Sequence, residues 1–168
     1  VREAMNRYST YCATHDQELL SREVFDAGNV KAPDHPAGEA RVHEKLAELS
    51  DKFVIAIGGD NSITYSVATG LWGNEIERAG LITFDAHHDL RDGISNGSPV
   101  ERLVQAGLSG KRIVQIGIAD FSNSPQYAQR AKEYGITVIP RSELRNRTAE
   151  SIVEQAISIA GALGGPMH

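Results

Sequence analysis

The sequence predicts an α/β fold in which helices cover both faces of a mostly parallel, doubly wound sheet. Three observations predict this class. Short continuous apolar runs recur along the chain, segments with helical periodicity separate them, and glycine or proline lies at many of the junctions. Such strand–helix repeats join parallel strands through right-handed crossovers. The 168 residues are interpreted as one domain, residues 1–168.

Residues 1–71 are predicted to hold three helices and two strands. Val1–Tyr11 is predicted to be a helix, and Glu23–Ala27 a weak short strand. Apolar residues recur with helical spacing in Ala37–Asp51. Phe53–Ile57 is a continuous apolar run, which is typical of a strand buried on both faces. Ser62–Leu71 is then predicted to be a helix.

The middle of the chain continues the alternation. Gly80–Phe84 and Arg112–Ile118 are predicted to be buried strands because each is a short apolar run. Pro99–Ala106 is predicted to be a helix, since proline is favourable in the first turn.

The last third is predicted to hold two helices and one strand. A helix over Ser124–Tyr134 is expected to stop at Gly135, and Ile136–Ile139 follows as a strand. Thr148–Leu163 is an amphipathic helix with Thr148 as its N-cap. Its expected apolar stripe comprises Ile152, Val153, Ala156, Ile157, Ala160 and Leu163.

Composition and charge exclude several classes of protein. The chain has 17 basic and 22 acidic side chains, a net charge of −5, which argues against a nucleic-acid binder. No apolar run approaches the ~20 residues of a membrane span, and residues 1–10 are too polar for a signal peptide. Cys12 is the single cysteine, so no internal disulfide forms, and a cytoplasmic location is expected.

Both ends of the sequence are interpreted as cut. The chain begins without Met inside a predicted helix, and it stops at a turn, Gly164–His168, where a further strand is expected. We therefore expect an internal portion of a larger protein.

Two predicted strands end in dense polar segments. Gly58–Ser62 follows the first, and Asp85–Asp89 follows the second. Ligands of parallel sheets bind beyond the carboxyl ends of strands. Asp85, His87 and Asp89 occupy alternate positions, so in an extended chain they point to one side. Two carboxylates and an imidazole suit Mn²⁺, and also Zn²⁺ or Fe²⁺.

Other interpretations of these segments stay open. The cluster could cap the turn that follows the strand. A serine–histidine–aspartate triad could use Ser62 and His87, although no nucleophile-elbow motif supports it. A nucleotide-binding sandwich would lack its glycine-rich fingerprint.

The two segments, Gly58–Ser62 and Phe84–Asp89, resemble the motifs of the ureohydrolases, the family of arginase, agmatinase and formimidoylglutamase. The resemblance implies a three-layer α/β/α sandwich and a binuclear manganese centre. It implies that Asp85 bridges the metals, that His87 binds one of them, and that Asp89 binds the other and aims the attacking hydroxide.

The sequence departs from this family pattern twice. A metal-binding His of the family is replaced here by Asn61, whose neutral amide is a weaker ligand. The family's third motif, Ser-x-Asp-x-Asp, is absent from the sequence. The chain is therefore expected to hold a partial site.

The loop after Asp89 contains residues that indicate the class of substrate. Arg91 would repel arginine or agmatine and would pair with a substrate carboxylate. Asn96 stands where arginases carry a proton-shuttling His. The resemblance is therefore strongest to formimidoylglutamase, which hydrolyses N-formimidoyl-L-glutamate to L-glutamate and formamide in histidine breakdown. Arg91, Ser95 and Asn96 are predicted to hold the glutamate part.

Three alternatives remain at this point. Arg91 could instead form a surface ion pair with Asp92 or with another acidic residue. The enzyme could be an agmatinase-like or guanidino-acid hydrolase that releases urea. The chain could also be a non-catalytic ureohydrolase-like protein. By analogy with the family, a homo-oligomer is expected.

Overall fold

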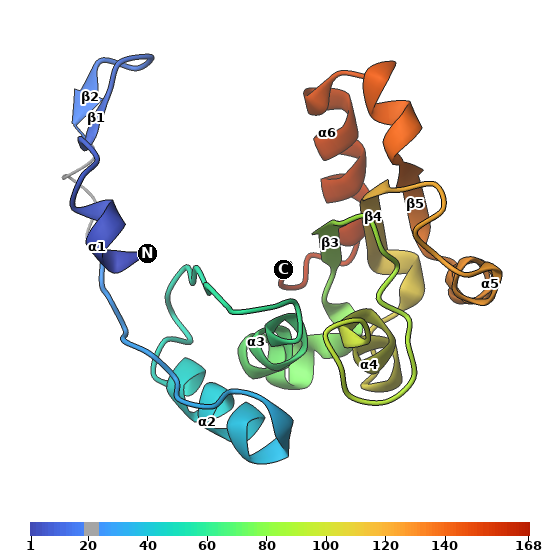
Figure 1. The fold of residues 1–168 in the computed structure, drawn as a ribbon, viewed down its shortest axis with the longest axis horizontal. Helices are drawn as coiled ribbons and strands as arrows, with labels where there is room; N and C mark the ends of the chain where they lie inside the picture. Colours follow the sequence, from blue (N-terminus) through green and yellow to red (C-terminus); the bar gives the residue numbers. More distant parts are fainter. Residues whose placement is uncertain (19–23) are drawn as a thin grey trace.

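A computed structural model describes residues 1–18 and 24–168 of the chain (Figure 1). Its helices, 3-10 helices and strands follow in chain order: α1 Arg2–Met5, β1 Tyr11–Cys12, β2 Gln17–Glu18, α2 His35–Ala47, α3 Ile63–Trp72, η2 Gly73–Arg78, β3 Leu81–Phe84, α4 Pro99–Gln105, η3 Gly110–Arg112, β4 Ile113–Ile118, α5 Pro125–Tyr134, β5 Thr137–Pro140, η4 Arg141–Arg145 and α6 Ala149–Ala160. No helix within the two described ranges is long and apolar enough to cross a membrane.

Strands β3, β4 and β5 form a parallel sheet in that order. Leu81 pairs with Ile113 across β3 and β4, and Ile116 pairs with Ile139 across β4 and β5. The strands are predicted correctly because each is a continuous apolar run that the sheet buries. Their parallel direction brings their carboxyl ends to one edge, where Asp85 follows β3.

Two apolar clusters show that helices cover both faces of this sheet. On one face, Val114 and Ile116 of β4 pack with Ile152 and Ala156 of α6. On the other, Ile113 packs in a cluster with residues of α3, α4 and α5. The predicted α/β class with a helix-covered parallel sheet is confirmed (Figure 1).

Two helix boundaries follow from local chemistry. The Thr148 hydroxyl accepts a hydrogen bond from the backbone N–H of Ser151 at 3.2 Å, so Thr148 caps α6 as predicted. Gly135 ends α5 in the left-handed region, with φ of 74°. Helix α6 ends at Ala160, so Leu163 of the predicted stripe lies beyond it. Within α6 the stripe is only partly buried, because Val153 and Ile157 are exposed.

The prediction of a buried strand over Phe53–Ile57 is wrong. The segment forms no strand, and Phe53, Ile55 and Ile57 are exposed. An apolar run becomes a buried strand only where neighbouring strands bond to it. The outer edge of β3 pairs with a different segment, since the N–H of Ile82 donates to the carbonyl of His168 at 2.8 Å.

The N-terminal predictions are also corrected. The predicted helix Val1–Tyr11 ends at Met5, and Tyr11 instead opens a small antiparallel hairpin, β1–β2. Of the predicted strand 23–27, residue 23 lies outside the described residues and 24–27 are irregular. This N-terminal part stands away from the sheet and its helices (Figure 1).

A buried arginine ties the end of α6 to the start of β3. Arg112, 5% exposed, donates from Nε to the carbonyl of Ala79 at 2.6 Å and from Nη2 to that of Ala160 at 2.7 Å. Nη2 also bonds to the carbonyl of Arg78. The Met167–His168 segment lies beside β3, where Met167 pairs with Gly80 in parallel.

Candidate metal centre

The two polar segments meet in the folded chain. Gly58–Ser62 leads into α3, and Asp85–Asp89 leaves the carboxyl end of β3. The side-chain amide of Asn61 donates a hydrogen bond to the Asp89 carboxylate. A contact across 28 residues of sequence therefore brings the segments into one site.

Asp85 and His87 form a close pair. Asp85 Oδ1 accepts a hydrogen bond from the backbone N–H of His87 at 2.8 Å and lies 3.1 Å from His87 Nδ1. The imidazole is more than half exposed, and the carboxylate about one third. The backbone bond also closes the turn after β3, so Asp85 does the capping that the alternative interpretation required.

Asp89 lies deeper. It is 8% exposed and has a φ of 54°, a left-handed conformation that aspartate tolerates better than most residues. Burial raises the pKa of its carboxyl to about 6, and the negative charge of Asp85 adds to the rise. His87, the hydrogen bond from Asn61 and the charge of Arg91 act on this pKa in the opposite direction.

Asn61 uses both ends of its amide within the protein. Its oxygen accepts a hydrogen bond from the Thr64 hydroxyl at 2.8 Å, while its nitrogen faces Asp89. The Asn61 amide therefore binds the Asp89 carboxylate. The role of Asn61 as a metal ligand stays a prediction.

The donor types of this site fit manganese, but their arrangement is incomplete. Asp85, His87 and Asp89 supply the carboxylate oxygens and imidazole nitrogen that Mn²⁺ accepts. Within residues 1–18 and 24–168, no group of three or more His, Cys, Asp or Glu side chains is arranged to hold a metal ion. Asp89 is turned to Asn61, so the three donors do not converge.

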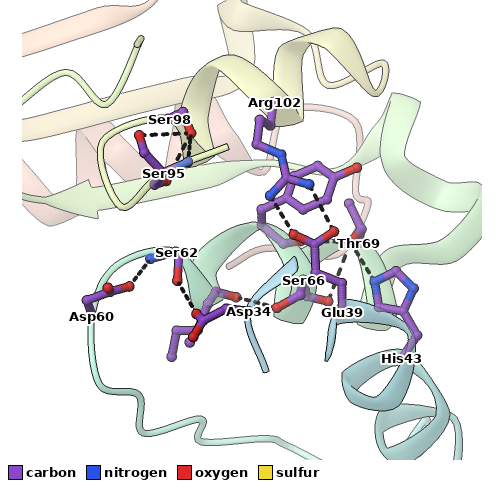
Figure 2. A network of polar contacts seen from close by, with 12 residues as sticks. Asp34, Glu39, His43, Asp60, Ser62, Ser66, Thr69, Ser95, Ser98 and Arg102 are labelled. Carbon is purple, nitrogen blue, oxygen red and sulfur yellow. Dashed lines mark hydrogen bonds and ion pairs between the residues drawn. The ribbon is translucent and has the colours of Figure 1, made fainter. Parts of the chain in front are cut away.

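The serine–histidine–aspartate alternative finds no support in these contacts. The Ser62 hydroxyl lies 3.5 Å from Asp34 Oδ1, and the His87 ring faces Asp85 (Figure 2 shows the Ser62 contact). Ser62 and His87 therefore engage different partners.

The loop after Asp89 separates the predicted substrate residues. The N–H of Arg91 bonds to the carbonyl of Gly97 at 3.0 Å, and the Arg91 side chain packs against Gly97. The alternative ion pair with Asp92 does not form, because that carboxylate binds Arg130 Nη1 at 2.8 Å. Among the described residues Arg91 forms no ion pair, and its guanidinium is available to an acidic ligand.

Ser95 and Asn96 line a separate cavity of about 210 Å³, together with Asp34 and Asp60. Arg91 is not among its lining residues.

The walls of this cavity are fixed by polar contacts. Arg102 Nη1 and Nη2 bind the Glu39 carboxylate at 2.6 and 2.9 Å, and the Arg102 guanidinium lies 3.6 Å from the centre of the Tyr65 ring (Figure 2). In the loop, the Ser98 hydroxyl accepts a bond from the Ser95 N–H and donates to its carbonyl.

Comparison with known proteins places this geometry in a family. A sequence profile of the arginase family matches residues 1–168, which is the whole chain. This chain belongs to the arginase family. Membership accounts for the parallel sheet and for polar segments at the carboxyl end of its strands.

Individual members of the arginase family are similar to the chain. It is 32% identical to formimidoylglutamase of Halalkalibacterium halodurans over 94% of its length, and 33% identical to mitochondrial agmatinase of Gallus gallus over 80%. These alignments cover 53% and 41% of the two relatives. The chain thus spans about half the length of these arginase-family relatives.

Solved structures of arginase-family proteins confirm the fold. The crystal structure of formimidoylglutamase from Bacillus subtilis superposes with a TM-score of 0.81 at 28% identity, covering 97% of this chain and 53% of that one. The structure of Trypanosoma cruzi formiminoglutamase with Mn²⁺ has a TM-score of 0.86 at 22% identity, covering 95% and 57%. The arginase-like fold predicted from the motifs is therefore confirmed.

Three residues that support the site were not predicted from the sequence. They are His88, Gln115 and Asn123, and both Gln115 and Asn123 bond to His88 behind the donor side chains. One signal was present, because Gln115 is a polar residue inside the apolar strand β4 and a buried amide requires bonded partners.

Proposed function

We propose that the chain supplies part of the active site of a manganese-dependent hydrolase that cleaves an amidine C–N bond. The proposed reaction converts N-formimidoyl-L-glutamate and water to L-glutamate and formamide. The observation that carries the proposal is the contact of Asn61 with Asp89 beside the Asp85–His87 pair, in a member of the arginase family.

Asp85, His87 and Asp89 are the residues that would hold manganese. The trypanosomal relative with Mn²⁺ is only 22% identical, so the proposal rests on the donors of this chain. When bound, the metal would make water a stronger nucleophile at neutral pH. Convergence of the three donors requires Asp89 to turn from Asn61, and further ligands would complete the centre.

Asp89 is proposed to orient the attacking water. Its carboxylate is buried, so few solvent molecules compete for its lone pairs. Asn61 donates a hydrogen bond to it, and this bond would be released when Asp89 turns toward the metal. An ionised Asp89 would accept a hydrogen bond from the water and direct a lone pair of the water oxygen toward the amidine carbon.

Arg91 is proposed to bind a carboxylate of the substrate. Its side chain is exposed, and the neighbouring Asp92 is already paired with Arg130. The cavity that Ser95 and Asn96 line also contains Asp34 and Asp60, and these acidic groups would repel a carboxylate there. The charge of the glutamate part is thus assigned to Arg91, and Ser95 and Asn96 to its uncharged atoms.

A urea-releasing hydrolase is the second candidate, because the agmatinase relative is 33% identical. A guanidino acid would satisfy the same Arg91. Self-association into a homo-oligomer and a cytoplasmic location remain predictions.

Metal stoichiometry tests the proposal first. The chain is loaded with Mn²⁺ at neutral pH, freed of excess metal and analysed for manganese, and hydrolysis of N-formimidoyl-L-glutamate, agmatine and arginine is then compared. The expected result is bound manganese with glutamate release from the first compound. A chain that binds no manganese would favour the non-catalytic alternative, and urea release would favour the second candidate.

Two variants assign the residues. Asp85→Ala should lose both metal and activity, whereas Asp120→Ala, which removes an exposed carboxylate beyond β4, should lose neither. Arg91→Ala should raise KM for the acidic substrate. An unchanged KM would remove Arg91 from the site.

A further inference from the structure

We propose that Gln115 and Asn123 are positioning residues of the candidate metal centre. They hold Ala86 and His88, the two residues that alternate with the donors Asp85, His87 and Asp89. The inference rests on the proposed function, since it concerns how that centre is held in shape.

Gln115, in the middle strand of the sheet, forms hydrogen bonds to the Asp85–Asp89 segment. It lies in β4, is fully buried, and pairs in register with Thr83 of β3. Its Nε2 donates to the backbone carbonyl of His88 at 2.7 Å, and its Oε1 lies 2.7 Å from His88 Nδ1. Both ends of a buried amide are thus bonded to one residue.

These two contacts determine the tautomer of His88. A backbone carbonyl only accepts hydrogen bonds, so the Gln115 nitrogen must face it and the Gln115 oxygen must face the ring. An amide oxygen only accepts, so His88 Nδ1 carries the proton. His88 is 4% exposed, and its ring is directed into the sheet while the His87 ring is exposed.

Asn123 holds the same segment from the loop after β4. Its Oδ1 accepts a hydrogen bond from the N–H of His88 at 2.9 Å, and its Nδ2 donates to the carbonyl of Ala86 at 2.9 Å. The N–H of Ala119 donates to the same carbonyl at 3.1 Å.

The segment needs such support because its conformation is costly. Asp89 has a positive φ, and a non-glycine residue keeps that conformation only where its surroundings enforce it. Bonds to Ala86 and His88 fix the backbone from which the three donors project. Removing supporting bonds of this kind typically changes metal affinity about 10–100-fold.

The test compares Mn²⁺ affinity of the full chain with three variants by calorimetric titration. Gln115→Leu removes both amide bonds, and Asn123→Ala removes the loop bonds from a partly exposed position where folding is less at risk. Val114→Ala is the matched control, because Val114 is fully buried in the same strand but packs on the opposite face. We expect an affinity about 10–100-fold weaker for the first two variants and a change within about twofold for the control.

A second readout does not depend on metal. In the metal-free chain, ¹⁵N chemical shifts of the His88 ring should show a protonated Nδ1, and Gln115→Leu should remove that preference. An unchanged ring tautomer in Gln115→Leu would show that Gln115 does not hold His88 in this orientation and would overturn its positioning role.

The outcomes separate the two proposals. If the unsubstituted chain binds Mn²⁺ and both variants bind it equally well, the positioning role is wrong and the proposed function stands. An equal loss in Val114→Ala would also overturn the positioning role, since any loss of packing would then suffice. If the unsubstituted chain binds no Mn²⁺, the metal centre and the inference built on it both fail.

Discussion

Replacing Asp89 by asparagine should stabilise the metal-free chain at neutral pH. Burial and the charge of Asp85 raise the Asp89 pKa from an ordinary 3.8 to about 6. Each pKa unit corresponds to about 1.4 kcal/mol, so ionising Asp89 in the folded chain costs about 3 kcal/mol. The hydrogen bond with Asn61 survives the substitution, because the oxygen of an asparagine amide can still accept from the Asn61 side chain.

The sign of the pH dependence follows from proton binding. Between about pH 4 and pH 6 the folded chain holds the Asp89 proton more tightly than the unfolded chain does. Stability associated with the protonated carboxyl is complete below the unfolded pKa and is lost as the pH rises through the folded pKa. The advantage of Asp89→Asn should therefore grow by about 2–3 kcal/mol between about pH 4 and pH 7.5.

Urea unfolding in the presence of a chelator, repeated across this pH range, measures the difference directly. Asp51→Asn is the control: hydrogen bonding to Lys52 lowers the pKa of the exposed Asp51, so this variant should gain nothing with rising pH. A difference between Asp89→Asn and the unsubstituted chain that stays constant over the whole range would refute the assigned burial of the charge.

Two further predictions concern arginines whose charge is largely shielded from solvent. Arg112→Met should lower the free energy of unfolding by about 3–5 kcal/mol, because three backbone carbonyls lose charge-assisted hydrogen bonds. Urea unfolding measures this loss. A loss under about 1 kcal/mol would contradict the prediction. For the Glu39–Arg102 pair, whose side chains are 15% and 14% exposed, a double-mutant cycle with Glu39→Gln and Arg102→Gln should give a coupling of about 1–2 kcal/mol. A coupling near zero would show that the two hydrogen bonds between Arg102 and Glu39 contribute no net stability.

Local sequence predicted those elements whose signals lie within a few residues. The strands β3, β4 and β5 follow from short apolar runs, and Thr148 and Gly135 mark the start and end of helices through bonds to their own neighbours. Phe53–Ile57 has the same apolar signal and forms no strand. Burial of a strand depends on adjacent strands, and that condition lies outside any local pattern.

Some features of the candidate site could likewise be predicted from local sequence, and others depended on the fold. The family, the parallel strands and the chemical types of the donors Asp85, His87 and Asp89 could all be predicted without coordinates, because motifs and periodicity are properties of contiguous residues. Three features came from the folded chain alone: the contact of Asn61 with Asp89, the separation of Arg91 from the cavity that Ser95 and Asn96 line, and the support of the donor segment by the middle of β4. Those contacts join residues far apart in the chain, and their geometry depends on how the strands and loops pack together.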